Sequence, residues 1–126
     1  MLLDTSAIVE IFRSRAGSAR FEEIMTKIGD EEVYISVVQL AEIADWAVRN
    51  GASPEERTEA VKEIARVVLL DERICSDAAA IKQRRRRTAR DFSLMDGIIL
   101  ATARSIGKRL LTLDEDFTGE KDCLVI

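Results

Sequence analysis

The chain has 126 residues, of which 47% are hydrophobic and 33% are charged, and its formal net charge is −4 at pH 7. This composition predicts one globular domain over 1–126, and the acidic balance argues against a nucleic-acid binder that relies on a basic surface alone. Because the chain has no histidine and only two cysteines, the common zinc sites are excluded, and no apolar run reaches membrane-spanning length.

The first half of the chain predicts short apolar strands that alternate with helices. The expected elements are a strand over 1–4, helices over 5–13 and 18–28, a strand over 33–35, and helices over 36–50 and 53–66. Ser36 is expected to cap the third helix, which stops at Gly51. Ser53 and Pro54 open the fourth with an unusually complete helix-start signal.

The second half continues the alternation. The expected elements are a strand over 67–70, helices over 71–88 and 93–107, and strands over 109–112 and 123–126. Ser93 opens the most apolar helix of the chain. Short apolar strands separated by helices predict an α/β fold with a parallel sheet covered on both faces. In such sheets ligands bind beyond the carboxyl ends of the strands, where the strand order reverses.

Four acidic residues lie inside apolar segments, where a folded core would not favour them: Asp4, Glu42, Asp96 and Asp114. Carboxylates are rarely buried unless they are paired, because removing water from a charge is costly. Without histidine, the natural partner is a hard cation held by oxygen ligands, Mg²⁺ or Mn²⁺. If these four acids are set aside, the remaining acidic and basic residues are equal in number, so a polyanionic substrate is compatible with the charge.

Each of the four acids also has a purely structural interpretation. Asp4 can cap the first helix, Asp114 can be a turn residue, and Glu42 can face solvent. Asp96 stands three residues after Ser93 and can complete a capping box. Asp96 is nevertheless the hardest to explain structurally, since its neighbours one turn before and after it are apolar.

Four segments of the chain together resemble the motifs of a known family. They are Leu-Leu-Asp-Thr-Ser-Ala (2–7), Ser-Val-Val-Gln-Leu-Ala-Glu-Ile (36–43), Phe-Ser-Leu-Met-Asp-Gly-Ile-Ile-Leu-Ala-Thr-Ala (92–103) and Leu-Leu-Thr-Leu-Asp-Glu-Asp-Phe (110–117). In order, spacing and surroundings the chain resembles the PIN-domain ribonucleases, and among them the VapC toxin of VapBC-type toxin-antitoxin pairs. The resemblance covers essentially the whole chain.

The resemblance implies a fold and a set of site residues. The fold is a three-layer sandwich whose central parallel sheet has four or five strands in the order 3-2-1-4-5, flanked by helices. The acidic quartet that binds metal and serves catalysis corresponds to Asp4, Glu42, Asp96 and Asp114. Asp116 matches a further acid of many members. The small hydroxyl residues that line the pocket correspond to Ser6 and Thr112.

The resemblance also implies an activity and partners. The activity is Mg²⁺- or Mn²⁺-dependent endonucleolytic hydrolysis of phosphodiester bonds in RNA. Asp4 and Asp96 are expected as direct ligands, since Mg²⁺ usually takes only one or two carboxylates and keeps several waters. The expected partners are an RNA substrate, a cognate antitoxin and a second copy of the chain. Cysteine usage and the lack of a membrane-spanning run predict a soluble cytoplasmic protein.

The arginine run over 84–87 has two interpretations. Because it covers about one helical turn, its side chains point in all directions, which is typical of a solvated helix end. The loop after it leads to Asp96, so Arg85, Arg86 and Arg90 are also candidates for contacts with RNA phosphates.

Two other functions stay open at this stage. A PIN-like module could bind RNA or protein without cleaving it. A receiver-type signalling domain could gather acids around Mg²⁺, although it needs a paired acid beside Asp4 and a lysine after a late strand, whereas Lys108 precedes one.

Overall fold

A five-stranded parallel sheet forms the centre of the computed structural model, which describes residues 1–126. The strands are β1 Leu2–Leu3, β2 Tyr34–Ser36, β3 Arg66–Val68, β4 Leu110–Thr112 and β5 Cys123–Val125. Their order is β3-β2-β1-β4-β5, and every neighbouring pair is parallel. The expected order 3-2-1-4-5 is therefore confirmed. Receiver-type domains have the order 2-1-3-4-5, so the receiver interpretation is wrong.

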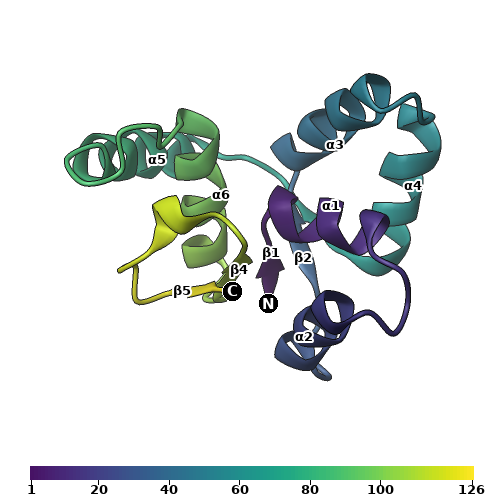
Figure 1. Ribbon diagram of the computed structural model, residues 1–126. Coiled ribbons are helices and arrows are strands. Elements are labelled where there is room, and N and C mark those ends of the chain that lie inside the picture. The colour runs from purple at the N-terminus through teal and green to yellow at the C-terminus, as the bar shows by residue number, and fades with distance from the viewer.

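Helices cover both faces of this sheet (Figure 1). They are α1 Thr5–Arg13, α2 Ala19–Ile28, α3 Val38–Arg49, α4 Pro54–Ile64, α5 Glu72–Arg85 and α6 Leu94–Ser105, with a short 3-10 turn η1 at Glu115–Phe117. Leu3 and Leu111 pack into the core under α1 to α4, whereas Leu2 and Leu110 pack into the core under α5 and α6. Successive strand residues therefore point to opposite faces, which makes the three-layer sandwich.

Most predicted helix starts are confirmed by the hydrogen bonds of their capping residues. The side chains of Ser18, Ser53, Asp71 and Ser93 each accept a hydrogen bond from a backbone N–H in the first turn of the helix that follows. Gly51 ends the third predicted helix with a positive φ of 68°, as expected. None of the helices combines the length and the apolar character that crossing a membrane requires.

Several predicted element boundaries are wrong, among them the following three. Ser36 does not cap α3, because it still pairs with Val68 as the last residue of β2, and its hydroxyl has no hydrogen-bond partner. The fourth helix ends at Ile64 and not near Arg66, since the Arg66 N–H donates to Val33 in the sheet. The fifth helix ends at Arg85, three residues before its predicted end.

Candidate active site

Asp4 lies directly after β1, at the point where the strand order reverses between β1 and β4. Its backbone N–H donates to the Leu111 carbonyl at 2.8 Å, and the residue is only 5% exposed. Its Oδ2 accepts hydrogen bonds from Ser6 Oγ at 2.5 Å and from Thr112 Oγ1 at 2.7 Å. Burial raises the pKa of the Asp4 carboxyl, and these two hydroxyls lower it. Ser6 and Thr112 thus contact the acid that they were predicted to accompany.

Glu42 lies in the second turn of α3 and is half-buried. Thr5 Oγ1, in the first turn of α1, donates a hydrogen bond to Glu42 Oε2 at 2.5 Å. Burial raises the pKa of Glu42, the Thr5 hydroxyl lowers it, and the negative charges of Asp4 and Asp96 raise it further. The interpretation of Glu42 as an ordinary solvent-facing residue is therefore wrong.

Asp96 has two roles in the structure. It completes the predicted capping box, because its Oδ2 accepts the Ser93 N–H at 2.6 Å and its own N–H donates to Ser93 Oγ at 3.1 Å. Burial raises its pKa, the hydrogen bonds with Ser93 lower it, and the charges of Asp4 and Asp114 raise it. The cap therefore holds this carboxylate in place, and the charges of Asp4 and Asp114 still act on it.

Asp114 and Asp116 lie on the turn that follows β4. The Asp114 N–H donates to Thr112 Oγ1 at 3.0 Å, and Asp114 Oδ1 accepts the Asp116 N–H at 2.9 Å. Burial and then the charges of Asp114 and Asp91 raise the pKa of Asp116, whereas Arg85 lowers it. Asp114 therefore caps η1, as its turn interpretation predicted, and stands at the same sheet edge as Asp4.

The four acids of the predicted quartet act on one another electrostatically without a neutralising cation. Glu42 is influenced by Asp4 and Asp96, and Asp96 by Asp4 and Asp114. Neither these four carboxylates nor that of Asp116 forms an ion pair with lysine, arginine or the amino terminus. The four acids of the quartet are therefore a concentration of negative charge without an ion-pair partner.

The donor set suits a hard divalent cation. The groups at this edge are carboxylate and hydroxyl oxygens, the ligands that Mg²⁺ and Mn²⁺ prefer. Both hydroxyls of the Asp4 site bind Oδ2, so Oδ1 has no side-chain donor. No three acidic side chains are arranged as a ready-made metal cage. Mg²⁺ in proteins usually binds only one or two carboxylates directly and keeps several waters.

Gln39 is a supporting residue that the sequence interpretation missed. It is fully buried, its Nε2 donates to the Leu3 carbonyl at 2.7 Å, and its Oε1 accepts the Ser36 N–H at 2.8 Å. The amide thus bridges β1 and β2 beyond their last paired residues and places Nε2 3.4 Å from Thr5 Oγ1. The available signal was a lone amide inside the apolar run Val-Val-Gln-Leu-Ala.

The three arginines proposed for RNA contacts have different environments. Arg85 points inward and donates to the carbonyl oxygens of Asp116 and Thr118. Arg86 Nε donates to the Phe92 carbonyl at 2.9 Å. Arg90 is exposed and has no side-chain partner. The structure therefore separates one free guanidinium from two that hold protein segments together.

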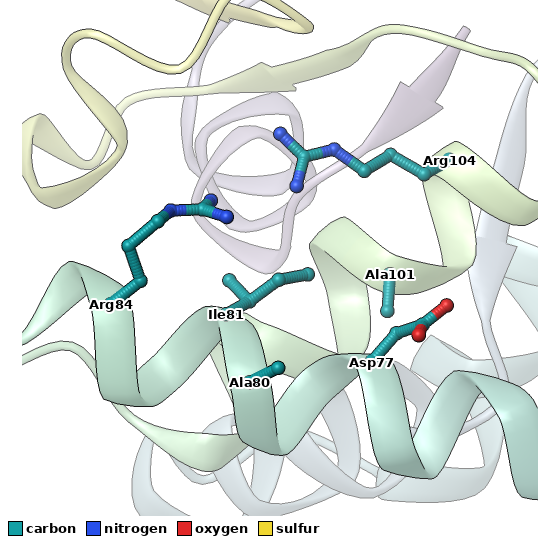
Figure 2. Close-up of a pocket in the computed structure, with 6 residues that line it drawn as sticks. All are labelled: Asp77, Ala80, Ile81, Arg84, Ala101 and Arg104. Atoms are coloured by element: carbon teal, nitrogen blue, oxygen red, sulfur yellow. The ribbon is translucent and has the colours of Figure 1, made fainter.

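A hollow of about 280 Å³ lies apart from these acids, between α5 and α6 (Figure 2). Its lining residues are Asp77, Ala80, Ile81, Arg84, Ala101 and Arg104. Figure 2 shows the guanidinium groups of Arg84 and Arg104 reaching toward each other from the two helices. Both groups bind Glu120, so the arginines here are engaged within the protein.

Comparison with known families settles the kinship of the chain. The family model of the PIN domain matches residues 1–119, which include all four acids and their supporting hydroxyls. The chain belongs to the PIN-domain family. No curated protein sequence is significantly similar to it.

Solved structures share the whole PIN fold with this chain at low sequence identity. A toxin-antitoxin complex from Klebsiella pneumoniae superposes with a TM-score of 0.76 at 23% identity, covering 98% of this chain and 95% of that one. VapBC-1 from nontypeable Haemophilus influenzae gives 0.72 at 20% identity, with 99% and 95% covered. VapC20 from Mycobacterium tuberculosis, described as a Sarcin-Ricin loop cleaving toxin, gives 0.71 at 21% identity, with 95% and 94% covered.

The burial of acidic side chains in this PIN domain predicts an unusual dependence of stability on pH. Burial is the largest cause that raises the pKa values of Asp4, Glu42 and Asp96 above their ordinary 3.8 or 4.5. The folded protein then holds protons that the unfolded chain releases, so the free energy of unfolding contributed by these groups falls as pH rises through this range and up to the raised values. We expect Glu42→Gln, whose amide can still accept from Thr5, to reduce this loss.

The measurement is thermal unfolding in EDTA from pH 4 to pH 8. Glu31 and Glu120 have lowered pKa values and act in the opposite direction, so the difference between wild type and variant isolates the Glu42 contribution. Glu42→Gln should gain melting temperature over wild type as pH rises. Asp30→Asn, which changes an exposed acid without an ion pair, serves as the control. A constant difference at all pH values would contradict the expectation.

Proposed function

We propose that this PIN domain is a Mg²⁺- or Mn²⁺-dependent endoribonuclease, the toxin of a toxin-antitoxin pair. One observation carries the proposal: the charges of Asp4 and Asp96 act on Glu42, those of Asp4 and Asp114 act on Asp96, and no cationic side chain forms an ion pair with any of the four. Membership of the PIN family supports the reaction class. Burying charge without a partner costs free energy, so four such acids in one folded domain point to a functional site.

The chemistry follows from what a phosphodiester requires. Hydrolysis needs an activated water, an in-line approach and relief of charge on the phosphate and the leaving oxygen, which a bound Mg²⁺ or Mn²⁺ supplies. Asp4 and Asp96 are the proposed direct ligands, and Glu42, Asp114 and Asp116 complete the acidic pocket. The carboxylates of the quartet accept hydrogen bonds from hydroxyls or backbone N–H groups, which fix the donor oxygens in advance.

Each supporting hydroxyl residue forms a hydrogen bond to one of the acids. Ser6 and Thr112 hold Oδ2 of Asp4, and Ser6 Oγ also accepts the Leu113 N–H at 3.0 Å. This ties the end of β4 to the start of α1 around the Asp4 carboxylate. Thr5 holds Glu42 in the same way from the neighbouring position. Arg90, with its exposed guanidinium, is the remaining candidate for contact with RNA phosphates.

The proposed protein partners are an antitoxin and a second copy of the chain. VapBC and other toxin-antitoxin assemblies are among the structures that share this fold. An apolar hollow of about 310 Å³ could receive an apolar antitoxin segment. Its lining residues are Leu3, Ile11, Phe21, Met25, Ile28, Val33 and Ile64. Met25 and Ile64 are 40% and 51% exposed, so an apolar partner would cover surface that otherwise faces water.

RNA cleavage by the purified protein tests the proposed activity. Single-stranded and structured RNA are incubated with Mg²⁺, with Mn²⁺ or with EDTA. We expect cleavage with either cation and none in EDTA. Millimolar Mn²⁺ should also raise the melting temperature, because the cation binds the folded acids and relieves their repulsion. Cleavage that persists in EDTA would contradict the mechanism, and a melting temperature indifferent to Mn²⁺ would contradict a site formed before substrate binds.

The partner proposal has its own test. The product of a short reading frame next to this gene should co-purify with the chain and suppress RNA cleavage. The light-scattering mass of the isolated chain should correspond to two copies. RNA cleavage with no inhibitory neighbour would instead indicate a nuclease that works outside a toxin-antitoxin pair, and metal binding without cleavage would indicate a non-catalytic module.

A further inference from the structure

Most arginines of the run at the end of α5 bind other groups of the protein. Arg84 Nη2 lies 3.0 and 3.1 Å from the two carboxylate oxygens of Glu120. Arg86 Nε donates to the carbonyl of Phe92, just before the Ser93 cap of α6. Arg87 is exposed, and its side chain has no protein partner. The run is therefore not the uniformly solvated helix end that its sequence suggested.

Arg85 is the most buried member of the run. Its side chain is 11% exposed, and Nη2 donates to the carbonyl oxygens of Asp116 and, at 3.1 Å, of Thr118. Nη1 lies 3.6 Å from Glu120 Oε1, and the guanidinium carbon lies 5.9 Å from the centre of the Phe92 ring. Nε is buried without a partner. Removing water from a guanidinium costs free energy. The hydrogen bonds to these carbonyls and the charge of Glu120 offset that cost.

The segment that Arg85 holds carries two acids of the proposed site. Asp114 and Asp116 lie on a single 3-10 turn, which is stabilised by few hydrogen bonds of its own. Repulsion between Asp96 and Asp114 would push such a turn outward. Arg85 provides a positive charge behind the turn and two hydrogen bonds to its backbone. Arg84 and Arg104 hold Glu120, at the far end of the same segment.

We propose that Arg85 is a positioning residue, which holds Asp114 and Asp116 at the acidic edge through the carbonyl oxygens of Asp116 and Thr118. The inference rests on the proposed metal site. It replaces the direct RNA contact that the sequence suggested for Arg85, because a guanidinium enclosed by Phe92, Glu120 and two carbonyls does not present its donors to a phosphate.

Hydrogen exchange of the metal-free protein tests the contact directly. Arg85→Met removes both the charge and the planar set of guanidinium donors. Arg85→Lys keeps the charge but cannot bridge two carbonyls in a fixed planar geometry. We expect amide exchange in residues 113–120 to become about ten-fold faster in Arg85→Met and intermediate in Arg85→Lys, with α1 unchanged. Arg87→Met is the matched control and should exchange like wild type. Should Arg85→Met fail to fold, Arg85→Lys still decides the outcome.

Metal binding and kinetics separate positioning from RNA contact. For the Arg85 variants, the Mn²⁺ concentration that gives half of the melting-temperature rise should increase about ten-fold or more. The kcat for RNA cleavage should fall, while KM and its salt dependence stay as in wild type. Unchanged exchange and unchanged Mn²⁺ binding would overturn the inference. So would a raised KM with a weaker salt dependence, which would indicate a phosphate contact. If the wild type has no nuclease activity, the proposed function is rejected. Amide hydrogen exchange and Mn²⁺ binding would still test the positioning role of Arg85.

Discussion

Replacement of Asp96 by Asn should lower the rate of RNA cleavage by about 100- to 1000-fold, or roughly 3–4 kcal/mol of transition-state stabilisation. The physical reason is the loss of one of the two proposed direct metal ligands, together with its negative charge. The fold should survive, because the amide oxygen of Asn can still accept the Ser93 N–H that caps α6. Removing the charge also relieves repulsion from Asp4 and Asp114, so the melting temperature without metal should not fall.

Two measurements make this expectation specific. Asp30→Asn applies the same chemical change to an exposed acid outside the site and should leave cleavage and Mn²⁺ binding at wild-type values. Calorimetric titration should show weaker Mn²⁺ binding by Asp96→Asn than by wild type. If Asp96→Asn cleaves RNA at the wild-type rate, Asp96 is only the helix cap that its capping box describes, and the proposed ligand set is wrong.

Replacement of Gly97 by Ala should destabilise the protein, against the usual preference of helices for Ala over Gly. A Cβ at Gly97 would lie 2.6 Å from the carbonyl oxygen of Ala78 and 3.3 Å from its carbonyl carbon. The contact joins α5 to α6 through backbone atoms, which cannot rotate away as a flexible side chain can. We expect a loss of about 1–3 kcal/mol in the free energy of unfolding, measured by urea denaturation.

The controls for Gly97 separate a backbone clash from a general effect on α6. Ser105→Ala, an exposed position in the last turn of this helix, should change the free energy of unfolding by no more than about 0.5 kcal/mol. A second change, Ala78→Gly, should not rescue Gly97→Ala, because it removes a methyl group and leaves the carbonyl oxygen in place. Rescue would show that the contact is not with the backbone. Since Gly97 follows Asp96, a forced shift of α6 should reduce RNA cleavage as well.

Local sequence signals predicted the elements well where the decisive contacts lie within a few residues. The helix Thr5–Arg13 has its predicted bounds, and Ser53, Asp71 and Ser93 start their helices as expected, because a cap binds an N–H three residues away. Ser36 failed as a cap for the opposite reason. Its conformation is set by pairing with Val68, thirty-two positions later, and no local pattern reports that pairing.

Some residues of the candidate site were predictable from local sequence, and others were not. The acids Asp4, Glu42, Asp96 and Asp114 were predictable, because charged residues inside apolar segments are conspicuous and their motifs carry a family resemblance. Gln39 was missed, since a single buried amide has no distinctive spacing. Arg85 was assigned to the substrate because an arginine run looks alike whether its side chains face solvent or the protein. Only packing against Phe92 and the turn after β4 reveals its direction.

The sequence by itself therefore determined which residues carry the charge and the order of the elements. These depend on residue type and on spacing along one helix or strand. The tertiary structure alone decided how the charge is held: Thr112 donates to Asp4 across 108 positions, and Thr5 reaches Glu42 across 37. Such contacts follow from the parallel pairing of β1 with β2 and with β4, which brings the residues that follow these strands together by packing and not by proximity in the chain.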